Sequence, residues 1–270
     1  MRSVPAAVAS RKRGTLLSVL TCAILRRPGP DFADGLTTAR LGKPELPLML
    51  AQHAAYAGAL RSLGLRIEML DPLPGFPDAH FLEDVAVVVP ELAVVTRPGA
   101  PSRRGEADSI VPVLGRHREV ARLEDPALLE GGDVLLVGRT VFIGLSARSN
   151  AEGARQLARL LLPHGYSAQT VPVPAGLHLK SSVSWVGGET LLVGERFADV
   201  PELRPFRRIV VDEAEKAVCN TLLVNGTLLI AAGFPRTKVQ LEESGLPVVE
   251  LDVSEARKMD GGLTCMSLRL

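Results

Sequence analysis

The sequence predicts a single α/β domain made of five similar units around a central axis. Three observations support this prediction: an apolar hairpin pattern occurs four times, its copies lie about 40 to 50 residues apart, and the chain ends supply two halves of a fifth copy. Such spacings are typical of radial or solenoid architectures. Pairing of the terminal strands would close the ring and remove exposed sheet edges.

The N-terminal stretch RKRGTLLSVLTCAIL, residues 11–25, has the basic start and apolar run of a secretory signal. No small-residue cleavage site follows it, and the run is too short to cross a bilayer as a helix, which takes about 20 residues. We therefore expect residues 1–15 to form a disordered extension, 16–26 to form a strand, and 16–270 to form the single domain, with no membrane partner.

The next expected element is a helix in LMLAQHAAYAGALRSLG, residues 48–64. Its predicted apolar face consists of Leu50, Ala54, Ala57 and Leu60, which recur at helical spacing. Gly64 is the expected stop signal, because glycine is favoured just after the last turn of a helix.

Four segments then repeat the pattern of apolar strand, turn and apolar strand: 84–96, 133–144, 181–194 and 220–233. Each contains a turn signal of the kind that closes a hairpin, namely Pro90-Glu91, Gly138-Arg139, Gly187-Gly188 and Asn225-Gly226. At the ends of the chain, LTCMSLRL has a first strand without a second, and LLSVLTCAIL has a second strand without a first. We expect these two segments to pair.

After the second strand, three copies place an arginine in a short loop before a helical pattern: Arg103, Arg148 and Arg236. The middle copy is the clearest, because Asn150 can cap a helix that ends before Pro163. The apolar residues of that helix recur at helical spacing and are Ala154, Leu157 and Leu161.

Composition excludes several classes of function. There are 31 basic and 30 acidic residues and few aromatic ones, so no surface for nucleic acid is expected. The cysteines Cys22, Cys219 and Cys265 lie far apart without CxxC or zinc-finger spacing, which argues against a disulfide framework and a structural zinc site. A reducing, cytoplasmic compartment fits this pattern best.

Alignment of the repeats shows that the most reactive side chains fall at the start of each unit's first strand. These residues are Glu83 with Asp84, Glu130 with Asp133, His178 with Lys180, Asn220, and Cys265. Alone, a cysteine such as Cys265 is more often a small buried apolar residue. Equivalent strand ends meet at one end of a radial fold, however, so this placement predicts a Cys/His/carboxylate group with a nucleophilic thiol.

These residues lie in motifs that resemble the dimethylarginine dimethylaminohydrolases, members of the pentein superfamily of guanidine-modifying enzymes. The resemblance extends from about residue 20 to the C-terminus. The motifs that carry it are FPDAHFLEDVAVV, TRPGAPSRRGE, LLEGGDVLLVG, FIGLSARSNAEGARQL, GLHLKSSVSWV, AVCNTLL and DGGLTCMSL. The resemblance implies a five-bladed α/β propeller and hydrolysis of Nω-methylated arginines to citrulline and dimethylamine or methylamine.

The resemblance also implies roles for individual residues. Cys265 would be the nucleophile, His178 the general acid and base, and Glu130 the carboxylate that orients the imidazole. Six residues would bind or cover the substrate: Asp84 with Glu83 beside it at the guanidinium, Asp78 at the guanidinium or the α-amino group, Arg103 and Arg148 at the α-carboxylate, and Leu36 in a lid over the substrate. The role of His80 stays open.

The implied reaction needs no metal and no organic cofactor. The expected partner is a small-molecule substrate, a methylated arginine, and the protein is expected to be a monomer or homodimer. One alternative is an arginine deiminase, an amidinotransferase or an agmatine deiminase. The chain is short for the extra helical domain of arginine deiminases, and paired arginines indicate a substrate with a free α-carboxylate, unlike agmatine. A second alternative is an inactive binding protein on the same fold, against which the complete set of Cys265, His178 and Glu130 argues.

Overall fold

The computed structural model describes residues 19–270, and within this range the strands form five three-stranded sheets. Each sheet is one unit with the same internal order. A first strand pairs antiparallel with a second, and the second pairs in parallel with a third. The predicted five-unit α/β fold is therefore confirmed. The expected extension, residues 1–15, lies outside the described residues.

The units follow one another along the chain, except that the first takes its first strand from the C-terminus. Unit one has β15 (Ser267–Arg269), β1 (Cys22–Arg26), α1 (Leu46–Ser62) and β2 (Arg66–Leu70); unit two has β3 (Ala86–Val88), β4 (Leu92–Val95), α2 (Glu106–Leu114) and β5 (Glu119–Arg122); unit three has β6 (Val134–Val137), β7 (Thr140–Leu145), α3 (Ala151–Leu161) and β8 (Ser167–Pro172).

The last two units complete the ring. Unit four has β9 (Val183–Trp185), β10 (Thr190–Gly194), the 3₁₀ turns η7 (Glu195–Phe197) and η8 (Pro201–Leu203), and β11 (Arg207–Val211); unit five has β12 (Leu222–Val224), β13 (Thr227–Ala231), α4 (Pro235–Glu242) and β14 (Val248–Leu251). A short helix, α5 (Ser254–Lys258), precedes β15. Further 3₁₀ turns are η1 (Phe32–Asp34), η2 (Leu82–Val85), η3 (Pro101–Arg103), η4 (Gly131–Asp133), η5 (Leu162–His164), η6 (Leu179–Ser181) and η9 (Glu213–Cys219).

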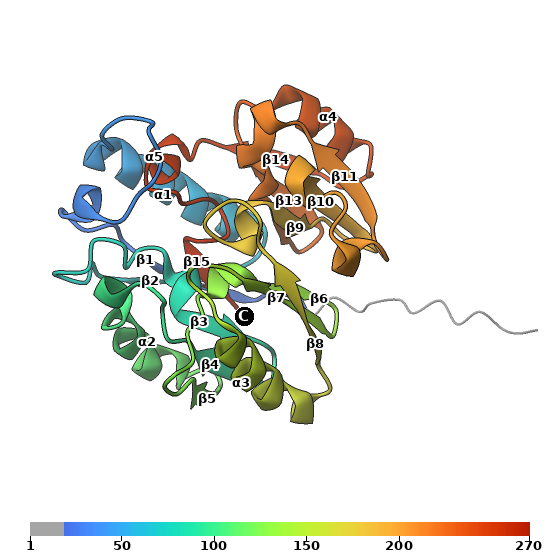
Figure 1. Ribbon diagram of the computed structural model, residues 1–270. Helices are drawn as coiled ribbons and strands as arrows, with labels where there is room; N and C mark the ends of the chain where they lie inside the picture. The colour runs from blue at the N-terminus through green and yellow to red at the C-terminus, as the bar shows by residue number, and fades with distance from the viewer. Residues whose placement is uncertain (1–18) are drawn as a thin grey trace, which may run out of the picture.

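Figure 1 shows the sheets arranged around a centre, with α1, α2, α3 and α4 on the outside and the C-terminus near the middle. First strands of neighbouring units contact one another, as β15 does β3, β6 does β9, and β9 does β12. The first strands therefore line the axis, and the residues that precede them gather around it.

The terminal strands pair as predicted, with Ile24 opposite Leu268 in an antiparallel register. The strand is shorter than the expected 16–26, because β1 starts at Cys22 and the residues 16–18 lie outside the described part. The physical reason is the length of its partner. The amides of Thr21 and Cys22 both donate to the carbonyl of Leu270, where the antiparallel pairing with β15 stops.

The four predicted hairpins are all present, and their turns lie at the predicted dipeptides. Asn225 and Gly226 both have positive φ, at 45° and 85°, which a two-residue hairpin turn with the twist of its strands requires. The predicted cap of α3 is also confirmed, since the Asn150 side chain accepts a hydrogen bond from the Gly153 amide at 2.8 Å.

The helix expected at 48–64 is α1, and Gly64 follows it with a φ of 91°. Its predicted face was partly wrong: Ala57 and Leu60 are buried, but Ala54 is exposed. The buried stripe consists of Met49, Gln52, His53, Tyr56, Ala57 and Leu60. The error arose because buried polar side chains, such as Gln52 bound to Ser254, do not register in a pattern of apolar residues. Among residues 19–270, no helix combines the length and apolar character needed to cross a bilayer.

Candidate active site

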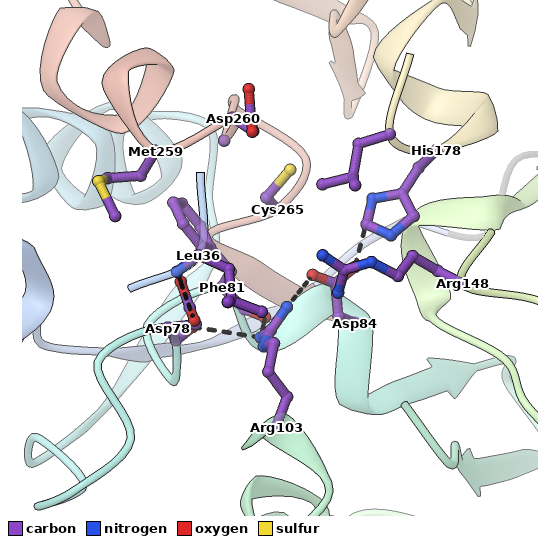
Figure 2. Close-up of a pocket in the computed structure, with 12 residues that line it drawn as sticks. Leu36, Asp78, Phe81, Asp84, Arg103, Arg148, His178, Met259, Asp260 and Cys265 are labelled. Atoms are coloured by element: carbon purple, nitrogen blue, oxygen red, sulfur yellow. Dashed lines mark hydrogen bonds and ion pairs between the residues drawn. The ribbon is translucent and has the colours of Figure 1, made fainter. Parts of the chain in front are cut away.

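Three of the residues that precede the first strands, Asp84, His178 and Cys265, line one pocket, as the repeat register predicted for them. Figure 2 shows Cys265, His178, Asp84 and Asp78 around it. The residues that line it come from all parts of the chain: Leu36, Asp78, Phe81, Asp84, Arg103, Arg148, Leu177, His178, Met259, Asp260, Gly261 and Cys265. Lys180 and Arg236, at equivalent repeat positions, are not among them.

His178 forms a buried pair with Glu130, with 2.7 Å between Nε2 and Oε2. Its other ring nitrogen, Nδ1, lies 3.9 Å from Oδ1 of Asp84. Burial acts to lower the pKa of His178, but the negative charges of Asp84, Glu130 and Asp133 outweigh it and raise the pKa to about 9. The imidazole is therefore held as a cation at neutral pH, ready to donate a proton.

Glu130 is completely buried and accepts from other groups besides the imidazole. Oε1 accepts from the Ala100 amide at 3.2 Å and from Nη1 of Arg148 at 3.3 Å. Burial acts to raise the pKa of Glu130, yet the hydrogen bond and charge of His178, with help from Arg103 and Arg148, lower it to about 2. Glu130 thus stays ionised and fixes the imidazole plane.

The two glycines of the EGGD segment allow this packing. A Cβ on Gly131 would lie 1.9 Å from the Glu83 carbonyl oxygen, so only glycine fits against that backbone. A Cβ on Gly132 would lie 2.6 Å from Nδ1 of His178. The Gly132 amide instead donates to Oδ1 of Asp84 at 3.1 Å, and the imidazole and the aspartate occupy the space.

Cys265 lies in the turn between α5 and β15, with its sulfur toward the pocket (Figure 2). Nδ2 of Asn220 is 3.9 Å from the sulfur and also donates to Thr264 at 3.0 Å. Burial, followed by the negative charges of Glu83 and Asp84, raises the pKa of the Cys265 thiol to about 12. A positive charge brought into the pocket would counter the charge of Asp84, which lines it, and favour the thiolate.

Asp78 and Asp84 present the negative charge that a guanidinium needs. Asp78 is buried, and its carboxylate accepts from the Leu36 amide at 3.1 and 3.2 Å. Burial raises the pKa of Asp78, against the opposing charge of Arg103. The contact with Leu36 joins the segment after β1 to the pocket rim, where a lid was expected.

The two predicted arginines lie at the pocket in different states. The Arg103 guanidinium is buried and binds Glu106, Asp84 and the carbonyls of Asp78 and Phe81. Arg148 has one ion pair, to Glu130 at 3.3 Å, and 20% of its side chain is exposed. Arg148 therefore keeps donors free for a ligand, while Arg103 must first release Asp84.

Within residues 19–270, one buried group at this site has donor atoms that could hold a metal ion, namely Asp84, Glu130 and His178. Their ligand atoms lie within 4.8 Å of one another. The nitrogen and oxygen of His178 and Glu130 already bind each other directly. The arrangement therefore has the form of a proton-transfer pair beside a thiol.

Comparison with known proteins agrees with this geometry. The family model described as N,N dimethylarginine dimethylhydrolase, eukaryotic, matches residues 45–231. A Pseudomonas aeruginosa N(G),N(G)-dimethylarginine dimethylaminohydrolase is 42% identical over 91% of this chain and 98% of its own. The chain belongs to the dimethylarginine dimethylaminohydrolase family. A Streptomyces coelicolor dimethylarginine dimethylaminohydrolase is 38% identical over 92% of this chain and 96% of its own.

A solved dimethylarginine dimethylaminohydrolase structure has the same fold. It is the P. aeruginosa enzyme with a cysteine replaced by serine, complexed with citrulline; the TM-score is 0.92 at 40% identity, covering 94% of this chain and 100% of that one. The family resemblance predicted from the motifs is thereby confirmed, as is the five-bladed architecture.

One residue predicted for the dimethylarginine dimethylaminohydrolase site lies elsewhere. The Glu83 side chain does not line the pocket, and its carboxylate binds Lys180 at 2.6 Å, Arg269 at 2.7 Å and Thr264 at 2.7 Å. The Glu83 amide also donates to the Cys265 carbonyl at 3.0 Å. In this structure Glu83 supports the loop that carries Cys265.

Sequence reasoning missed Asp260, which lies at the pocket between α5 and Cys265. Oδ2 of Asp260 accepts from the amide and hydroxyl of Thr38, the latter at 2.9 Å, and the Thr37 hydroxyl donates to the Lys258 carbonyl at 2.8 Å. These contacts hold the segment that contains Leu36 against the loop that leads to Cys265. The available signal was the DGG sequence, because Asp260 has the positive φ of 57° that aspartate tolerates in turns.

Proposed function

We propose that this protein hydrolyses Nω-methylated arginines to citrulline and dimethylamine or methylamine through a covalent intermediate on Cys265. The observation that supports this best is the composition of the pocket. A thiol, an imidazole paired with a carboxylate, and two aspartates face one pocket, as a cationic substrate attacked at carbon requires. Membership of the dimethylarginine dimethylaminohydrolase family agrees with it.

The substrate guanidinium binds between Asp84 and Asp78. Its delocalised cation makes the central carbon a poor electrophile, so the site must neutralise the charge and fix the plane while leaving the carbon open. Charge-assisted hydrogen bonds from two buried carboxylates meet both needs. Asp84 takes part by exchanging its bond to Arg103 for one to the substrate.

Cys265 then attacks the central carbon as the thiolate. The pKa of about 12 shows that its thiol is protonated without a compensating charge. A bound guanidinium supplies this charge, because it binds Asp84, one of the carboxylates that raise the pKa. The proton leaves to solvent, and the new carbon–sulfur bond gives a tetrahedral adduct.

His178 protonates the nitrogen that departs. Its pKa of about 9 keeps it cationic at neutral pH, so it can give its proton to the methylated nitrogen as the carbon–nitrogen bond breaks. The amine leaves, and a thiouronium remains on Cys265. The neutral imidazole then takes a proton from a water molecule, whose oxygen attacks the same carbon. Breakage of the carbon–sulfur bond then releases the thiolate, and loss of the remaining hydroxyl proton to solvent gives citrulline.

The α-carboxylate of the substrate binds Arg148. This arginine has free donors at the pocket, and its planar fork suits a carboxylate. Arg103 supplies a second donor through Nη1 after the substrate takes over Asp84. The Leu36 segment covers the ligand, held closed by Thr37 and Thr38 on the loop of Asp260.

The protein acts on its small-molecule substrate as a monomer or homodimer in the cytoplasm. Support for this compartment comes from the cysteines Cys22, Cys219 and Cys265, which are all free thiols.

Selectivity arises at the nitrogen that faces His178. Dimethylation removes both hydrogens from this nitrogen, so a buried acceptor opposite it would be left without a donor. A pocket that accepts the dimethylated nitrogen therefore places no such acceptor there. In the test, purified protein receives asymmetric dimethylarginine, monomethylarginine and arginine separately at equal concentration, and citrulline is quantified. We expect the methylated substrates to have the higher kcat/KM. A higher kcat/KM for arginine would make the protein a deiminase instead.

A further inference from the structure

Asp133 is a completely buried carboxylate that does not line the pocket. Its oxygens accept three hydrogen bonds. Oδ2 accepts from the hydroxyls of Ser146 and Ser149, both at 2.6 Å, and Oδ1 accepts from the Leu179 amide at 2.8 Å. A buried carboxylate is costly unless its lone pairs are satisfied, and these donors satisfy them.

Each of the three donors is connected, by a hydrogen bond or by the chain itself, to a residue with a proposed role in the reaction. The hydroxyl of Ser149 accepts from the Glu130 amide at 3.1 Å, and that of Ser146 accepts from the Arg148 amide at 3.0 Å. Leu179 is the residue that follows His178. Asp133 therefore connects the backbones of three site residues that come from three separate segments: η4, the loop after β7, and η6.

The backbone of β7 packs closely against the Asp133 carboxylate at Gly144. A Cβ on Gly144 would lie 2.7 Å from Oδ1 of Asp133 and 2.9 Å from Cβ of Leu179. The strand β7 thus approaches the carboxylate as closely as glycine permits. Because the group is fixed, its three hydrogen bonds fix the three segments relative to one another.

We propose that Asp133 is a positioning residue for the reaction, holding Glu130, His178 and Arg148 in the relative geometry that catalysis needs. The proposal rests on the proposed function of this site. Asp133 also acts at a distance on His178, since its negative charge is one of those that keep the imidazole protonated. Its two effects, position and charge, can be separated by variants.

Asp133→Asn removes the charge and keeps the size. The new amide group would offer hydrogens to two hydroxyls whose own protons then lose their acceptor. We expect kcat to fall by about 10²-fold, the scale of a misplacement of about 1 Å at the reacting groups. The basic limb of the kcat profile should move to lower pH, because the acid His178 loses a neighbouring negative charge.

Ser149→Ala keeps the charge and removes only the connection to Glu130. It should lower kcat by about tenfold and leave the basic limb where the wild-type enzyme has it. Asp108→Asn is the matched control: it also removes one negative charge, but from an exposed aspartate on α2 that pairs with Arg122. It should have wild-type kcat and pH dependence.

The decisive measurement is a 15N NMR titration of the His178 imidazole in wild type and Asp133→Asn, because it needs no substrate. A lower pKa in the variant, together with the loss of kcat, supports the proposal. If Asp133→Asn lowers only the melting temperature, with unchanged kcat and His178 pKa, Asp133 is structural and the proposal is wrong. If that variant does not fold, wild-type kcat in both Ser146→Ala and Ser149→Ala overturns it equally. Failure of the proposed function would appear separately, as a wild-type enzyme without activity on methylarginine.

Discussion

Nε2 of His178 lies 2.7 Å from Oε2 of Glu130, and its Nδ1 lies 3.9 Å from Oδ1 of Asp84. One nitrogen is thus used to hold the ring, and the other is the one that can exchange a proton with a ligand. This division is what a general acid and base requires, because the ring stays oriented through both proton transfers.

His178→Ala should therefore lower the turnover rate by about 10²-fold or more, which is the scale of losing general acid–base catalysis. The remaining site can still bind the guanidinium through Asp84 and Asp78. Steady-state citrulline formation measures the effect, with circular dichroism to show that the fold persists. A wild-type rate in this variant would remove His178 from the acid and base role.

Arg148→Ala should chiefly weaken recognition of the α-carboxylate, by about 2 to 4 kcal/mol in kcat/KM, the scale of a lost charge-assisted contact. The control substrate is the decarboxylated analogue of methylarginine, which lacks the group. Discrimination between the two substrates should collapse in the variant. Equal discrimination by wild type and variant would show that Arg148 does not bind the carboxylate.

The pH dependence of Cys265 alkylation provides a further prediction. Since burial and the charges of Glu83 and Asp84 raise the thiol pKa to about 12, iodoacetamide should label the free enzyme slowly near pH 7 and faster as the pH rises toward this value. Adding guanidinium ion should move the profile to lower pH, because the cation neutralises the carboxylates. A profile centred at the ordinary pKa near 8.5 with no response to the cation would contradict this account of the thiolate.

A stability prediction concerns two buried histidines. His53 on α1 and His80 are buried, with Nε2 of each unpartnered, and His80 packs against Phe32 and Phe81. Burial is the main cause that lowers the pKa to about 4 for His53 and about 3 for His80. Above pH 6.5 both histidines are neutral in the folded and the unfolded chain, so their protonation does not change the free energy of unfolding.

As the pH falls below 6.5, the unfolded chain gains these protons while the folded protein does not, so the free energy of unfolding decreases until about pH 4 to 3. For His53 alone the loss amounts to roughly 3 kcal/mol. Urea unfolding between pH 7 and 4 should show a flatter decline in His53→Leu than in wild type. His164→Gln is the control and should follow wild type; a wild-type slope in His53→Leu would refute the assignment.

Much of the fold was predictable because each hairpin has a strong local signal. Turns such as Asn225-Gly226 and caps such as Asn150 depend on neighbouring residues only. The third strands, β2, β5, β8, β11 and β14, were not predicted. They lie at the outer edges of their sheets and are largely exposed or half-buried, as in SAQTVP of β8, so they lack a continuous apolar pattern.

The candidate site was predictable where the repeat register fixed the position. The register brought Asp84, Glu130, His178 and Cys265 to one end of the axis. It could not show which way a side chain points, and neighbours differ in this respect: Asp84 faces the pocket, while Glu83 turns to Lys180 and Arg269. Nor could it show the link between Asp260 and Thr38, because such a contact between distant loops has no periodic signal.

The central claim is that Cys265 becomes covalently bonded to the substrate, and mass spectrometry of enzyme quenched in acid during turnover tests it most directly. The account predicts a peptide containing Cys265 that carries the mass of the thiouronium, absent from Cys265→Ser, with Cys22 and Cys219 unmodified. Turnover that proceeds with no substrate-derived mass on Cys265 at any quench time, or with that mass on another residue, would contradict it.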